Sequence, residues 1–125
     1  MARFLSPAWL AEMSEAAAGA EVPDGAELTI QQVVTDTPEG DVAYVVRLAG
    51  GRLALEPGRD PAAAVTITED WATAAALARG DLSPQGAFMA GRIRVGGDVG
   101  ALVGVGEALG ALTDLFASVR YGTTF

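Results

Sequence analysis

Hydrophobic and polar residues alternate over several short stretches of the chain, which is typical of strands that bury one face. In the clearest stretch, Val42–Leu48, every second residue is a large apolar one. Turn-forming residues separate the stretches, with a Thr-Pro-Glu-Gly cluster at 37–40 and a glycine pair at 50–51. The pattern predicts five strands, at residues 27–35, 41–50, 52–56, 63–68 and 91–96.

The first four predicted strands follow one another closely, and short connections of this kind favour an antiparallel meander. One face of the sheet is apolar, apart from Gln32, which falls in phase with it. The other face carries polar residues, namely Thr29, Gln31, Arg47, Arg52, Thr66 and Thr68. Because a sheet with one apolar face needs a cover, we expect an α+β fold. In this fold, helices cover one face of a five-stranded antiparallel sheet, within a single domain over residues 1–125.

Helical spacing of apolar residues, together with start and stop signals, predicts the helices that cover the sheet. Four helical regions are expected, and their starts are Ser6-Pro7, Thr68 as an N-cap, Ser83-Pro84 and Asp98. The first three end at Gly19, Arg79-Gly80 and Gly91. The last region contains glycines at 100, 104, 106 and 110, each of which weakens a helix by about 1 kcal/mol relative to alanine. We therefore expect that helix to be loose or broken.

Missing residue types exclude most catalytic chemistry. The chain has no His, Cys, Lys or Asn, so it cannot form a Ser-His-Asp triad, a Cys-His pair, a lysine Schiff base or a thiolate or imidazole metal site. The remaining acid–base candidates are carboxylates, most of them explained by helix caps and turns: Glu56, Glu69, Asp70, Asp81 and Asp98. We expect no enzyme activity, no cofactor and no transition metal.

Charge and hydropathy restrict the partners. The net charge is −8, with 16 acidic and 8 basic residues, which argues against binding to nucleic acid or to anionic lipid surfaces. The N-terminal apolar run is interrupted too early for a signal peptide. No stretch reaches the ~20 apolar residues of a membrane-spanning helix. We expect a cytoplasmic protein without stable membrane insertion.

The order of motifs over residues 80–98 resembles a known family. Gly80 precedes a short Pro-led helix with an Ala-Phe-Met run at 87–89, and Gly91, a strand with alternating arginines and a Gly-Asp pair at 97–98 follow. This order is similar to the signature of the sterol carrier protein type two family. Residues 65–71 also resemble that family's junction between a strand and a helix. The likeness in element order covers roughly residues 7–118, although arginines stand at 92 and 94 where many members carry lysine.

The resemblance implies that the sheet and its helices enclose an apolar tunnel for a sterol, a fatty acid or an acyl-CoA. We therefore expect a protein that binds such a ligand in an internal cavity without catalysing a reaction. The hypothesis extends to transfer of the bound ligand. The candidate lining residues, with Gln85 as a polar anchor, are Trp71, Gln85, Phe88, Met89, Ile93, Leu109, Leu112 and Phe116. The competing interpretation of each apolar residue in this set is ordinary core packing.

A second hypothesis is a protein-interaction or homodimerisation module associated with a lipid-metabolising enzyme. Aromatic side chains are strong anchors at interfaces, and several lie near the two termini: Phe4, Trp9, Tyr121 and Phe125. They would serve as anchors if exposed. The alternative is that they pack back onto their own domain.

Overall fold

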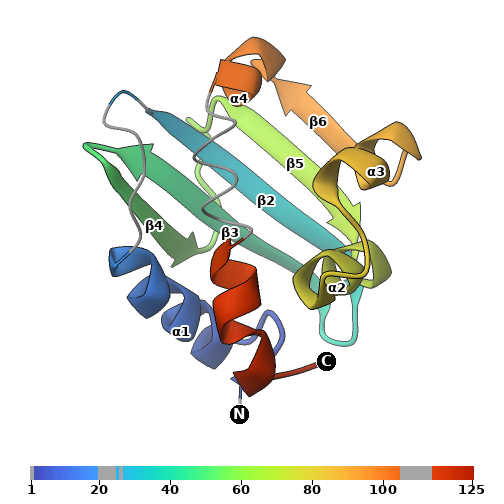
Figure 1. Ribbon diagram of the computed structural model, residues 1–125. Coiled ribbons are helices and arrows are strands. Elements are labelled where there is room, and N and C mark those ends of the chain that lie inside the picture. Colours follow the sequence, from blue (N-terminus) through green and yellow to red (C-terminus); the bar gives the residue numbers. More distant parts are fainter. Residues whose placement is uncertain (1, 20–24, 26, 105–113) are drawn as a thin grey trace.

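The computed structural model describes residues 2–19, 25, 27–104 and 114–125. A five-stranded sheet in the order β4-β3-β2-β5-β6 forms its centre (Figure 1). The strands are β2 (Leu28–Thr37), β3 (Gly40–Ala49), β4 (Arg52–Pro57), β5 (Val65–Asp70) and β6 (Ile93–Gly97). All five coincide with the strands expected from the alternating pattern, with small shifts at their ends. The α+β class is confirmed.

The helices begin where short polar side chains accept hydrogen bonds from the first turn. They are α1 (Pro7–Ala18), α2 (Trp71–Arg79), α3 (Pro84–Met89) and α4 (Val99–Gly104). Ser6 and Ser83 cap α1 and α3 as predicted, and Asp98 Oδ1 accepts from Ala101 N in α4. The cap of α2 is Asp70, not Thr68. Pairing of β5 with β2 continues to Asp70, so the chain leaves the sheet two residues later than predicted.

The last helical region has two described parts. The first part is α4, and helix resumes over residues 114–119 before a 3-10 turn, η1 (Arg120–Gly122). The expected weakening at Gly106 and Gly110 lies outside the described residues. Helix 114–119 and α1 lie over the same face of the sheet (Figure 1). We call this the inner face.

The two chain ends lie side by side. The short strands β1 (Ala2–Arg3) and β7 (Thr123–Thr124) pair in parallel. Phe4 is 6% exposed and lies edge-on to Trp9, with ring centroids 4.9 Å apart. Phe125 is half-buried between the Phe4 ring and the Arg79 guanidinium. Packing of the terminal aromatics on their own domain is therefore confirmed for Phe4 and Trp9, while the side chain of Tyr121 lies outside the described part.

The prediction of a purely antiparallel sheet is wrong at one connection. β5 pairs with β2 in parallel, with Val65 opposite Ile30, whereas the other neighbouring strands are antiparallel. The parallel pairing arises because residues 58–64 leave the edge strand β4, pass β3 and β2, and enter β5 on the far side of β2. Residues 58–64 therefore form a crossover connection rather than a hairpin loop.

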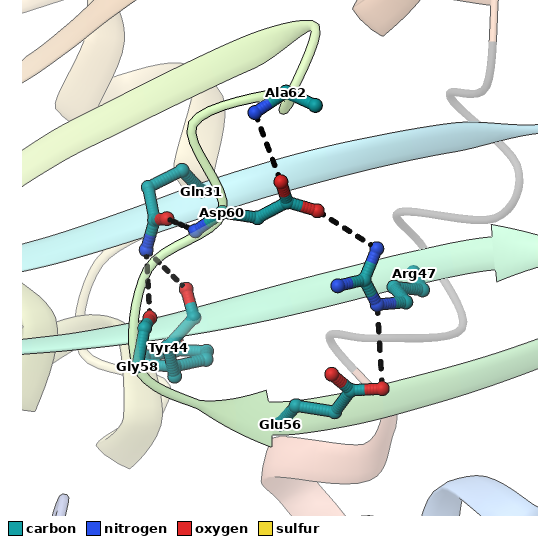
Figure 2. A network of polar contacts seen from close by, with 7 residues as sticks. All are labelled: Gln31, Tyr44, Arg47, Glu56, Gly58, Asp60 and Ala62. Carbon is teal, nitrogen blue, oxygen red and sulfur yellow. Dashed lines mark hydrogen bonds and ion pairs between the residues drawn. The ribbon is translucent and has the colours of Figure 1, made fainter.

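Gln31 of β2 holds this crossover connection on the outer face (Figure 2). Its amide Nε2 donates to the carbonyl oxygens of Tyr44 at 3.0 Å and Gly58 at 3.1 Å. Its Oε1 accepts from the backbone N–H of Asp60 at 2.6 Å. The connection covers the side chain, so Gln31 is only 5% exposed on the face predicted to be polar.

Ion pairs flank the Gln31 amide (Figure 2). The guanidinium of Arg47 contacts Asp60 Oδ2 at 3.0 Å and Glu56 Oε1 at 3.3 Å. The hydrogen bond from Ala62 N, and then the one from Arg47, lower the pKa of Asp60 below its ordinary value. Exposed ion pairs contribute little stability. We therefore infer that these ion pairs orient the crossover connection rather than stabilise the fold.

The far end of the crossover is fixed by backbone contacts. Ala64 N donates to Thr29 O at 3.1 Å, and Ala64 O accepts from Asp98 N at 2.9 Å. Gly97 passes this carbonyl with a φ of +89°, where a side chain would collide with Ala64. Only glycine fits this close approach.

We predict that Gln31→Leu lowers the free energy of unfolding by about 2–4 kcal/mol, because it removes the four hydrogen bonds of the amide, including one to Gln32 O, and leaves buried or partly buried backbone partners unpaired. Urea denaturation at pH 7, followed by circular dichroism, measures the change. Gln32→Leu, the same substitution on the next residue, is the matched control and is treated below. A midpoint for Gln31→Leu equal to that of the wild type would contradict a structural role for this amide.

Candidate functional site

The inner face of the sheet is unevenly covered. Under α1, the side chains of Ile30, Val46 and Leu55 in β2, β3 and β4 are at most 4% exposed. Val65 of β5 is also fully buried, but farther along β5 and on β6 the inner-face side chains of Ile67, Ile93 and Val95 are only half-buried. We call this half-covered surface the β5–β6 surface. It forms the apolar part of the candidate site.

Three of the predicted lining residues contribute to this area or to the adjoining core. Ile93 is half-buried on β6 and lies opposite Glu69. Trp71 is half-buried at the start of α2, two residues after Glu69, and packs against the core. Phe116 is half-buried and stacks on Trp9, with ring centroids 6.0 Å apart. Ile93 thus lies across the strand pair from Glu69, and Trp71 follows Glu69 along the chain.

Two other predicted residues lie on the surface instead of in the core. On α3, Phe88 is 55% exposed and Met89 is 86% exposed. The helix α4, which follows β6, also exposes apolar side chains at Val99 and Val103. Exposed apolar side chains therefore precede and follow β6 along the chain.

The remaining predicted residues lie outside the described part, namely Leu109, Leu112 and the side chain of Gln85. The structure shows a small pocket elsewhere, between the segment before α1, the β2–β3 turn and Trp71. It has a volume of about 20 Å³, which is room for about one water molecule. The predicted ligand-sized cavity stays a prediction, since Leu109 and Leu112 belong to its proposed wall.

The inner face also carries a buried polar cluster that was not predicted as a site. Its members are Gln32, Tyr44 and Glu69, which are 7%, 3% and 8% exposed. Gln32 lies opposite Tyr44 on β3 and opposite Ile67 on β5. Glu69 follows Ile67 by two residues and so faces the same side. In the sequence, Gln32 falls in phase with the apolar residues of its strand, and this was the signal for its inward position. The predicted helix cap at Thr68 instead placed Glu69 in a helix.

Gln32 has an unpaired buried atom. Among the described residues, Gln32 Oε1 is a buried side-chain acceptor without a hydrogen-bond partner. An unpaired buried acceptor costs about 1–3 kcal/mol of stability. Unpaired buried polar groups are rare in folded proteins, so each requires an explanation. A bound ligand that donates a hydrogen bond to this oxygen would be such an explanation.

Burial raises the pKa of Glu69 to about 7, and the charge of neighbouring Asp70 adds to the shift. No ion pair within the described ranges includes Glu69. Burial, and then the charge of Glu69, also raises the pKa of Tyr44 above its ordinary value. Asp70 behaves oppositely, because its hydrogen bonds with Thr73 lower its pKa. The polar cluster therefore holds one carboxyl group that titrates near neutral pH.

The structure shows two further properties of the described part of the chain. No helix in it has the length and apolar character needed to cross a membrane. Nor do three or more of its carboxylates gather closely enough to hold a metal ion. The acids considered for catalysis include groups with structural roles, since Asp70 and Asp98 cap helices and Glu56 pairs with Arg47.

We predict that Gln32→Leu raises the free energy of unfolding by about 1–2 kcal/mol, because it replaces an unpaired buried amide with an apolar group of similar size. Urea denaturation under the conditions used for Gln31→Leu measures the difference. The two substitutions should act in opposite directions. A loss of stability in Gln32→Leu would show that this amide has a structural partner.

We predict that stability falls as the pH rises from about 4.5 to about 7, since the pKa of Glu69 is higher in the folded than in the unfolded chain. Below this window Glu69 is protonated in both the folded and the unfolded chain, and its full contribution to the free energy of unfolding is present. At about 1.4 kcal/mol per pKa unit, the loss is about 3 kcal/mol.

Denaturation of the wild type and of Glu69→Gln between pH 5 and pH 8 measures this loss. The window avoids the lowered pKa values of Asp60 and Asp70, whose contributions are lost only at more acidic pH. Glu69→Gln should remove the slope, whereas the exposed control Glu56→Gln should keep it. An unchanged slope in Glu69→Gln would assign the pH dependence to another group.

The same fold occurs in solved structures of other proteins. A conserved hypothetical protein from Thermus thermophilus, described as possibly a sterol carrier protein, matches with a TM-score of 0.75 and 21% identity, over 95% of this chain and 91% of that one. Sterol carrier protein 2 matches with a TM-score of 0.74 and 23% identity, over 91% and 97%. The palmitated SCP2L2 protein of Aedes aegypti matches with 0.61 and 23%, over 78% and 90%. These likenesses show the fold.

The amino-acid sequence of the chain shows the family to which it belongs. No curated protein matches it, but the family model described as the SCP-2 sterol transfer family matches residues 8–109. That range includes the five strands of the central sheet, most of α1, the helices α2 to α4 and the motifs at 80–98 on which the resemblance was based. The chain belongs to the SCP-2 sterol transfer family.

Proposed function

We propose that this protein binds an apolar lipid between the β5–β6 surface and the helices that surround it, and does so without catalysing a reaction. The observation that carries the proposal is the exposure of large apolar side chains around β6, above all Phe88 and Met89. Large exposed apolar patches mark binding sites on soluble monomers, and the four large exposed apolar side chains of the described residues precede and follow a single strand, β6, along the chain. Family membership supports the same class of ligand.

The energetics fit a lipid chain. Each methylene that leaves water contributes about 0.8 kcal/mol, so a chain of ten buried carbons gains roughly 8 kcal/mol before the costs of ordering. A lipid chain bound on the β5–β6 surface would also bury the half-buried side chains of Ile67, Ile93 and Val95 further. Sterols, fatty acids and acyl-CoA all remain within this proposal, as does transfer of the ligand to another protein or membrane.

Absence of catalysis is part of the proposal and rests on the side chains present. The chain has no His, Cys or Lys, and Asp70, Asp98 and Glu56 have structural roles. The alternative of an interaction module loses two of its anchors, because Phe4 and Trp9 are buried. The burial of these anchors therefore favours the lipid-binding hypothesis over the interaction hypothesis.

We predict saturable binding of the neutral probe Nile red at micromolar concentration, with a change in tryptophan fluorescence as Trp71 responds. Phe88→Ala should weaken binding several-fold, while the free energy of unfolding falls by less than about 1 kcal/mol, because this ring is half-exposed. Thr66→Ala, on the exposed outer face of β5, is the control and should bind as the wild type does.

Native mass spectrometry of the freshly purified protein, with extraction of whatever co-purifies, tests the same proposal without a probe. A lipid of stoichiometric amount is the expected result. If no lipid co-purifies and Nile red shows no saturable binding, the lipid-binding proposal fails. If Phe88→Ala instead unfolds the protein, the ring is a packing residue and not part of a site.

A further inference from the structure

We propose that Gln32 and Glu69 form the polar end of the lipid site and select an apolar ligand that carries a single hydroxyl group over one that carries a carboxylate. This inference rests on the proposed lipid binding and adds the chemistry of the ligand's polar end. It is carried by the placement and bonding of these two side chains on the inner face.

Both side chains face the same side of the sheet and are diagonal neighbours. β2 and β5 pair in parallel, with Gln32 opposite Ile67 and Val34 opposite Glu69. In neighbouring strands, side chains on one face that are offset by two residues remain within reach of a common group. Each side chain is more than nine-tenths buried. A single polar atom of a ligand can therefore contact both.

The unpaired acceptor at this position favours a ligand that donates a hydrogen bond. Gln32 Oε1 is an acceptor without a partner among the described residues, and an ionised Glu69 carboxylate offers acceptors only. A ligand hydroxyl donates a hydrogen bond and satisfies one of these atoms. At pH 8, above the raised pKa of Glu69, a ligand carboxylate has no proton to donate and meets the negative charge of that side chain.

Glu69 has no arginine ion-pair partner among the described residues. Each ion pair in the described part of the chain uses an acid other than Glu69. Arg92, at the start of the β6 region, donates through Nε to Thr73 Oγ1 at 3.1 Å. Arg47 and Arg94 belong to the outer face, since they alternate with inner-face residues of β3 and β6. Discrimination against an anionic ligand therefore follows from the local charge.

Apolar side chains surround the polar end and continue toward the β5–β6 surface. Ile67 lies beside Gln32, Val95 lies opposite Ile67, and Ile93 lies opposite Glu69. All three are only half-buried. A ligand with its hydroxyl at Gln32 and Glu69 would lay its hydrocarbon part on these residues. The arrangement fits an alcohol with a long or bulky apolar body.

The test compares three ligands of the same chain length: hexadecan-1-ol, its methyl ether and hexadecanoate. Each is delivered from methyl-β-cyclodextrin at pH 8 and competes with Nile red. We expect the alcohol to bind about tenfold more tightly than the ether, which lacks the donor, since one buried hydrogen bond is worth about a factor of ten. Hexadecanoate should bind more weakly than the ether.

Variants assign the preference to residues. Gln32→Leu should reduce the difference between alcohol and ether to less than about twofold. Glu69→Gln should raise the affinity for hexadecanoate toward that for the ether. Thr66→Ala, on the opposite face, should retain all three affinities.

The outcomes separate this inference from the proposed function. If all three ligands bind and the wild type treats alcohol and ether alike, the inference is wrong and lipid binding stands. The same holds if Gln32→Leu keeps the preference for the alcohol. If none of the ligands displaces Nile red and Nile red itself does not bind, the proposed function fails and the inference fails with it. If Gln32→Leu does not fold, the wild-type comparison of alcohol with ether decides.

Discussion

The amide of Gln31 contacts the backbone of both a sheet strand and the crossover connection, and the order of the strands depends on those contacts. A connection between parallel strands usually contains a helix and a dozen or more residues. Here residues 58–64 are enough, because Gln31 adds hydrogen bonds with Gly58 and Asp60 to the few that this short irregular segment makes within itself. Without this connection β5 would have no route to β2. The inner face would then lack the strand that carries Glu69.

Two consecutive glutamines on β2 therefore have different physical roles. Gln31 points to the outer face, where its oxygen and nitrogen are both bonded. Gln32 points to the inner face, where its oxygen is unpaired among the described residues. A buried amide with partners stabilises a connection, whereas one without partners reduces stability. Retaining the second kind fits a site in which binding compensates for the cost, as at many functional positions.

Local patterns predicted the strands and most helix ends, because those features depend on neighbouring residues. Ser6-Pro7 and Ser83-Pro84 start helices as expected, and Gly80 ends α2 in the left-handed conformation that glycine favours. The crossover was not predictable in the same way. Gly58 and Pro61 are equally typical of a hairpin loop, and the contacts that distinguish the two join Gln31 to residues far along the chain.

The candidate site was predictable only in part for a related reason. Spacing placed Ile93 on the inner face, and this position follows from the alternation along β6. Glu69 was assigned to a helix start because acids are favoured there, but pairing on both sides keeps it in β5. Exposure of Phe88 and Met89 depends on which segments pack against α3. A hydrophobic pattern shows that a residue is apolar, not whether another segment covers it.

The crossover also has a consequence for the order of folding events. One amide, that of Gln31, contacts both the hairpin of β2 and β3, at Tyr44 O, and the crossover connection, at Gly58 and Asp60. The hairpin of β2 and β3 uses contacts close in sequence, which form at low entropic cost. We therefore expect the hairpin in the transition state and β5 as a late addition.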